Sequence, residues 1–127
     1  MSVSYSVYEV PDLQSGEQEK THQARVYSNG TIKTNELCKL ISERSSISAA
    51  DVKATLDSLN FCFDFFLSQG YNVELDDLGI FSLGLKSSKV KRTEDKTVLG
   101  VHINGIHFRP SVKLKEQIAN FKLQHKA

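Results

Sequence analysis

The histidines and cysteines, which often carry catalysis or bind metals, are few in this 127-residue chain and form no recognisable motif. The histidines and cysteines are His22, Cys38, Cys62, His102, His107 and His125. His102 and His107 are five positions apart and would face opposite sides of a regular strand, so we expect no metal site. Neither cysteine has zinc-ligand spacing. Both fall at apolar positions of expected helices, where a buried small hydrophobic residue is the simpler interpretation.

No arrangement typical of an enzyme is recognisable either. The sequence has no nucleophile beside a base, no glycine-rich phosphate loop and no positioned carboxylate pair. Asp76-Asp77 is better explained by the preference of aspartate for turns. We therefore predict that the protein is not an enzyme and that it uses no cofactor and no small-molecule substrate.

The charged residues indicate a different chemistry, because two parts of the chain have net charges of opposite sign. Residues 1–85 hold six basic and twelve acidic residues, a net charge of −6, whereas residues 86–127 hold ten basic and three acidic residues, a net charge of +7. Neutralising phosphates and releasing their counterions supplies most non-specific affinity for DNA. The C-terminal segment is therefore a candidate phosphate-binding surface, and an ordinary solvated charged tail is the alternative.

Two helices are predicted in the middle of the chain. Residues 34–44 carry apolar side chains on one helical face, and Thr34 and Asn35 are possible caps. Ser48, three residues before Asp51, opens a second helix that should end at Gly70. This pair of helices is expected to form the core.

The second predicted helix is hydrophobic nearly all round in its second half. Besides one regular apolar stripe it carries apolar residues on its other sides. A small monomer can hardly cover such a helix, whereas the same patch of a second copy can. We therefore predict a homodimer whose interface includes Phe61, Cys62, Phe63, Phe65 and Phe66.

Strands are predicted on both sides of the helices. They cover residues 4–10, 22–28, 71–75, 78–85 and 98–108. The first two should pair as a hairpin that needs a larger body to lie on, and the last two should form a long hairpin with a basic, exposed end. Ser111 should cap a final helix over residues 112–121.

This order of elements resembles the HU and integration host factor family over about residues 34–121. The motifs that carry the resemblance are Asn35-Glu36-Leu37 with Leu40-Ile41, Ser48-Ala49-Ala50-Asp51-Val52, the run from Tyr71 to Phe81 with its Leu78-Gly79-Ile80-Phe81, and Phe108-Arg109-Pro110-Ser111. A β-extension before the first helix is similar to the divergent HU-like branch of Bacteroidetes bacteria. The resemblance implies an α+β fold and an intertwined dimer. Each chain would have a helix-turn-helix pair, a three-stranded antiparallel sheet with a basic β-arm, a short C-terminal helix and an N-terminal β-hairpin extension.

The same resemblance implies a histone-like function, in which the two arms of a dimer embrace double-stranded DNA with little sequence preference and package or bend it. The expected DNA-binding residues are Lys86, Lys89, Lys91, Arg92 and Lys96 in the arm, with Arg109, Lys113 and Lys115 around the start of the last helix. The chain departs from the family in having no arm-tip proline, since its prolines are Pro11 and Pro110. It departs again in Asp76-Asp77, which could weaken contact between the body and DNA. A fold relative that binds a protein through its N-terminal hairpin or arm edge is the alternative.

Three segments are expected: a β-extension at residues 1–33, an HU-like DNA-binding domain at residues 34–122 and a tail at residues 123–127. No stretch approaches a membrane-spanning helix, and the first ten residues lack the features of a secretory signal. We therefore predict no membrane partner and a cytoplasmic location with the nucleoid.

Overall fold

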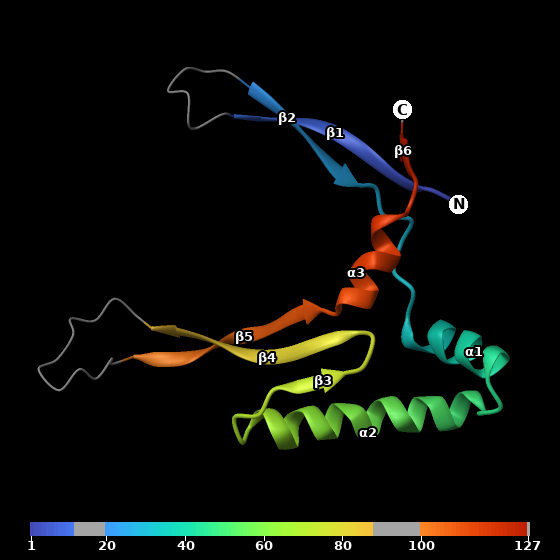
Figure 1. Ribbon diagram of the computed structural model, residues 1–127, viewed down its shortest axis with the longest axis vertical. Helices are drawn as coiled ribbons and strands as arrows, with labels where there is room; N and C mark the ends of the chain where they lie inside the picture. The colour runs from blue at the N-terminus through green and yellow to red at the C-terminus, as the bar shows by residue number, and fades with distance from the viewer. Residues whose placement is uncertain (12–19, 88–99, 127) are drawn as a thin grey trace, which may run out of the picture. The chain divides into compact units, whose positions relative to one another are not determined.

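The computed structural model describes residues 1–11, 20–87 and 100–126 (Figure 1). The chain folds into two compact units, one formed by residues 1–33 with residues 117–127 and the other by residues 34–116. The described residues form three helices and two three-stranded sheets. The predicted α+β class is confirmed.

Two helices form the buried centre of the larger unit. α1 (Thr34–Arg44) packs against α2 (Ala49–Leu67), and the buried apolar residues of the described chain are Cys38, Val52 and Leu67. Ser48 caps α2 as predicted, since its hydroxyl accepts a hydrogen bond from the backbone N–H of Asp51 at 3.2 Å. After α2, Gly70 turns the chain with a φ of 87°, which glycine adopts at low cost.

Three antiparallel strands follow in the order β3-β4-β5: β3 (Val73–Leu75), β4 (Gly79–Ser87) and β5 (Val101–Pro110). Their existence is confirmed, and their ends differ from the predicted ones by up to three residues. Asp77 lies in the turn between β3 and β4 with a φ of 65°. The predicted turn at Asp76-Asp77 is therefore present.

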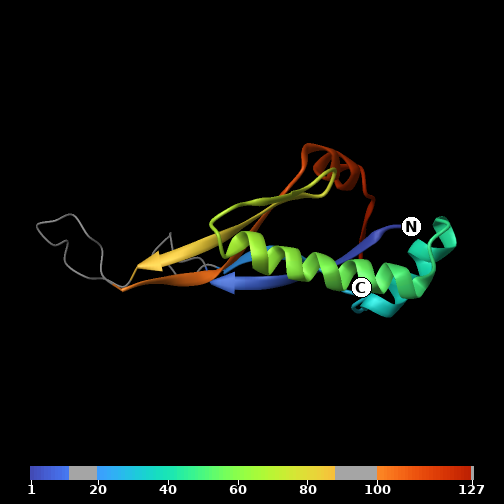
Figure 2. The ribbon, with the colours of Figure 1, turned by 90° about the horizontal axis from the view of Figure 1, so that it is seen from below.

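The sheet has two chemically different sides. The rings of Phe81 and Phe108 stack with centroids 4.8 Å apart, and the ring of Phe63 in α2 lies 4.9 Å from that of Phe81. We call this side the inner face, and the opposite side the outer face. α2 runs alongside the sheet (Figure 2). The inner face therefore supplies the packing between sheet and helix, and the outer face is left for other contacts.

A β-bulge interrupts the pairing of β4 with β5. Leu83 pairs with Ile106 but Leu85 pairs with Ile103, so β5 contains one extra residue between these two pairs. Gly105 lies in this extra stretch with a φ of 109°. The bulge changes which side chains of β5 share a face.

The smaller unit is a second sheet with the order β2-β1-β6. β1 (Val3–Pro11) and β2 (Lys20–Val26) form the predicted antiparallel hairpin. α3 (Val112–Ala119) ends two residues before the predicted end, and the chain then adds β6 (Leu123–His125) parallel to β1. Residues 123–127 were expected to be a tail, and the strand within them is a difference from the sequence analysis. A three-residue strand is too short to show an alternating pattern.

Candidate nucleic-acid interface

The outer face of the β3-β4-β5 sheet carries two of the four residues of the predicted DNA-binding site that the structure describes. Residues opposite one another in an antiparallel pair lie on the same face. The outer face carries Glu74 from β3, Ile80, Ser82, Gly84 and Lys86 from β4, and His102, His107 and Arg109 from β5. It is therefore polar and mainly basic, opposite to the aromatic inner face.

Lys86 and Arg109 are the two predicted DNA-binding residues on this face. Lys86 stands opposite His102, Arg109 stands opposite Ile80, and both side chains are exposed. Among the described residues neither takes part in an ion pair. Lys53 of α2 differs, because its Nζ donates a hydrogen bond to Asp57 Oδ1 at 2.8 Å, which raises the pKa of Lys53. Lys86 and Arg109 thus keep their charges available to an anion.

The remaining arm residues of the predicted site are Lys89, Lys91, Arg92 and Lys96, and they lie outside the described residues. They stay predictions. Their segment connects the end of β4 to the start of β5.

The expectation that His102 and His107 face opposite sides is wrong, and the bulge is the reason. His107 stands opposite Ser82 and His102 opposite Lys86, four residues apart on β4, so both histidines lie on the outer face. The ring of His107 lies over Gly84, where a Cβ atom would clash with Nε2 and lie 2.8 Å from Cδ2. A glycine inside a strand pattern, here Gly105, is the sequence signal that could have predicted the bulge.

The start of α3 is tied to the β3–β4 turn. Ser111 caps the helix as predicted, because its Oγ accepts a hydrogen bond from the Leu114 N–H at 3.0 Å while donating to the Asp77 carbonyl oxygen at 2.8 Å. Lys113 Nζ lies 3.2 Å from Asp77 Oδ2, and both side chains are exposed. Such a pair is weak, but it offsets part of the charge that Lys113 could offer to a phosphate. Lys115 is exposed.

The predicted interface residues divide into two groups. Phe63 is half-buried against Phe81, whereas Phe61, Cys62, Phe65 and Phe66 are exposed in the single chain. The exposed rings form a continuous surface cluster, with centroids 6.2 Å apart for Phe61 and Phe65 and 5.1 Å apart for Phe65 and Phe66. Cys38 is buried as expected, but Cys62 is not, because it shares the uncovered side of α2.

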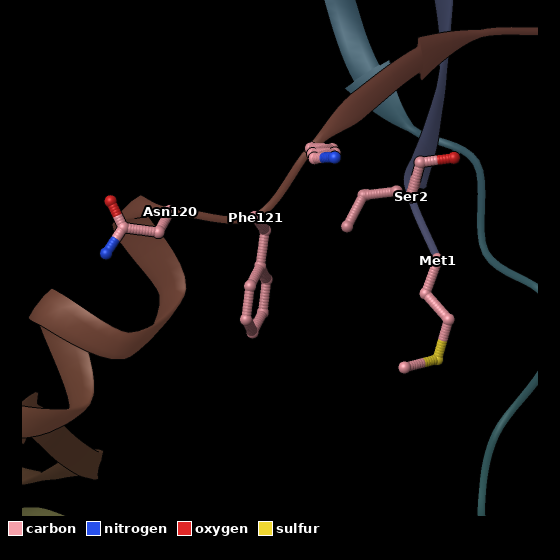
Figure 3. Close-up of a pocket in the computed structure, with 6 residues that line it drawn as sticks. Met1, Ser2, Asn120 and Phe121 are labelled. Carbon is pink, nitrogen blue, oxygen red and sulfur yellow. The ribbon is translucent and has the colours of Figure 1, made fainter.

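The side chains that can bind metals are scattered over the described parts of the chain. No three His, Cys, Asp or Glu side chains come together there to hold a metal ion. A hollow in the smaller unit is lined by Met1, Ser2, Val3, Asn120, Phe121 and Lys122, with the Met1 and Phe121 side chains on either side of it (Figure 3). It is open and mostly apolar. Within the described ranges, no helix combines the length and apolar character needed to cross a bilayer.

Comparisons with known proteins agree with this architecture. A family model described as "HU domain fused to wHTH, Ig, or Glycine-rich motif" matches residues 1–125. Among 24 matching chains of solved structures is HU from Anabaena, in a cocrystal with DNA, at 18% identity and a TM-score of 0.56, covering 70% of this chain and 99% of that one. A candidate bacterial DNA-binding protein from Bacteroides vulgatus matches at 10% identity and a TM-score of 0.64, covering 97% of this chain and 48% of that one. The comparison with curated proteins gave no match.

Proposed function

Because the chain belongs to the family in which an HU domain is fused to a wHTH, Ig or glycine-rich motif, we propose that it is a non-enzymatic, histone-like protein of the nucleoid. In this proposal a homodimer binds double-stranded DNA with low sequence specificity. The DNA lies along the outer faces and the arms, where the arm of each chain is residues 85–103. Packaging or bending of DNA is its expected role.

The observation that carries the DNA-binding proposal is the segregation of charge on the β3-β4-β5 sheet. Lys86 and Arg109 are exposed on one face, and the connecting segment adds four more basic residues. Lysine and arginine side chains that reach phosphates give affinity with little sequence preference. HU from Anabaena, which shares the fold, was crystallised with DNA. Since neither Pro11 nor Pro110 lies in the arm, we expect bending without a proline wedge between base steps.

The homodimer is proposed from the apolar surface that one chain leaves uncovered. Phe61 and Phe65 are 66% and 51% exposed on α2. The inner face continues beyond α2 with the exposed side chains of Leu83, Leu85, Ile103 and Ile106. Burying one large apolar side chain contributes about 1.5–3 kcal/mol, and a two-fold interface buries each such patch twice. A second copy of the chain therefore suits both surfaces.

The DNA-binding proposal is tested by a fluorescence anisotropy titration on a labelled duplex of about 30 base pairs. The variant K89A/K91A/R92A is compared with the control K33A/K39A/K53A, which removes the same number of charges outside the basic C-terminal segment. We expect the arm variant to lose at least about tenfold in affinity, because each lost phosphate contact lowers binding, and the control to lose much less. Equal losses in the two variants would mean that the arm is not the binding surface.

A second candidate function is supported by the smaller unit. On one side of its sheet lie Val7, Val26 and Leu123, with exposed fractions of 47%, 71% and 70%. The same side also carries Glu9, His22 and His125. Exposed apolar side chains among polar ones are typical of a surface that binds another protein. A chain that acts only in this way has no reason to bind duplex DNA in a salt-dependent manner, so the titration distinguishes the two functions.

A further inference from the structure

Two histidines lie on the same basic face as Lys86 and Arg109, and nothing in the function proposed above uses them. His102 stands opposite Lys86, and His107 is two residues from Arg109 along β5. Both side chains are exposed. The extra residue of the bulge puts His102 on this side of the sheet together with His107. Without it, one of the two would point to the aromatic inner face.

The spacing of the histidines excludes a shared metal ion and suits a row of anions. Their partners on β4 are four residues apart, which corresponds to about 13 Å along a strand. A single metal ion binds histidine nitrogens at about 2 Å, so it cannot reach both. Phosphates of a duplex, by contrast, recur at short intervals along each strand.

The position of His107 also favours contact with a ligand outside the protein. Its ring lies over Gly84, so the neighbouring residue on β4 contributes no side chain that covers it. Nδ1 of His102 lies 3.3 Å from the Gly100 carbonyl oxygen, which leaves Nε2 for another partner. Each imidazole thus has a nitrogen that can face an anion lying on the sheet.

The charged groups around the two imidazoles are mixed in sign. On the outer face the described charged residues are Glu74 from β3, Lys86 from β4 and Arg109 from β5. Glu74 stands opposite Ile80, which lies between it and Arg109 in the sheet. Among the described residues of the strands, the cations Lys86 and Arg109 are the charged residues nearest to the two histidines. These residues offer a protonated histidine no balancing charge, and an anion bound to the face would supply one.

We propose that His102 and His107 bind DNA phosphates in their protonated form, so that affinity for duplex DNA rises as the pH falls. The inference rests on the proposed DNA-binding function. Histidine gains its second proton between about pH 8 and pH 5, and an anion beside it favours the charged form. The association constant is therefore high at low pH and falls as the pH rises through this range.

The test measures the affinity for a 30-base-pair duplex at pH 7.5 and at pH 5.5, at one ionic strength. Most carboxylates stay ionised in this interval. The wild-type protein should bind at least about five times more tightly at pH 5.5 than at pH 7.5, because each chain gains two weak surface ion pairs with the DNA. H102Q/H107Q should bind with nearly equal affinity at both pH values. H102R/H107R should bind tightly at both.

The chain offers a matched control in its other two histidines, which belong to the smaller unit. H22Q/H125Q should keep the pH dependence of the wild-type protein. Retention of that dependence in H102Q/H107Q, or its loss in H22Q/H125Q, would overturn the inference while leaving DNA binding intact. Absence of binding by the wild-type protein at both pH values would instead refute the proposed function itself. Circular dichroism of each variant at both pH values shows that the fold is retained.

Discussion

Replacing Gly79 by alanine should destabilise the protein strongly, because two separate costs meet at this residue. Gly79 begins β4 opposite Pro110 and has a φ of 155°. A Cβ atom there would clash with the Arg109 carbonyl oxygen, lie 2.6 Å from Cε2 of Phe108 and lie 3.0 Å from Cα of Pro110. Two of these three atoms belong to the backbone and cannot turn away. An unfavourable backbone conformation costs about 1–3 kcal/mol, and overpacking costs a similar amount. We therefore expect the free energy of unfolding to fall by about 4 kcal/mol.

The matched control for this prediction is Gly70→Ala. Gly70 also has a positive φ, 87°, but a Cβ atom there would meet nothing within 4 Å. Only the backbone cost remains, about 1–2 kcal/mol. Urea unfolding followed by circular dichroism, at one protein concentration because a dimer is expected, gives both values. If Gly79→Ala costs no more than Gly70→Ala, the reasoning about close packing at the start of β4 is refuted.

Three further predictions concern α3, the surface of α2 and the β3–β4 turn. Ser111→Ala should lower the free energy of unfolding by about 1 kcal/mol, because the helix loses its cap, and an unchanged urea midpoint would contradict this role. Phe65→Asp should shift the protein toward monomer in sedimentation velocity, since a charge would be buried in the proposed interface; an unchanged dimer fraction would exclude this face of α2. Asp77→Asn removes the partner of Lys113 and should change stability by less than about 1 kcal/mol. The same variant should bind DNA more tightly at low salt, and equal affinity would mean that this turn is far from the DNA.

Local signals in the sequence were sufficient to predict the helices and the hairpins. Ser48 and Ser111 each lie at a helix start, and both accept the expected hydrogen bond from a backbone N–H three residues later. Apolar periodicity then predicted the two central helices, because 11 and 19 residues are long enough to show a face. These elements depend mainly on nearby residues, which a sequence displays directly.

The errors arise where a distant partner decides the structure. The face of His102 depends on a one-residue insertion in the pairing of β5 with β4, which a count of positions along β5 alone does not reveal. β6 exists because β1 offers an edge, although the two are more than a hundred residues apart. Cys62 looked like a core residue, and its exposure depends on what covers the far side of α2. The arm residues from Lys89 to Lys96 stay predictions from sequence.

The most direct test of the central claim is the salt dependence of DNA binding. The association constant of the wild-type protein for a 30-base-pair duplex is measured at several salt concentrations between about 50 and 200 mM. If the protein binds phosphates, the logarithm of the association constant should fall linearly with the logarithm of the salt concentration, with a slope of about −0.9 per phosphate contacted. The slope should be shallower for K89A/K91A/R92A. An affinity that does not change with salt, or no binding at 50 mM, would contradict the account.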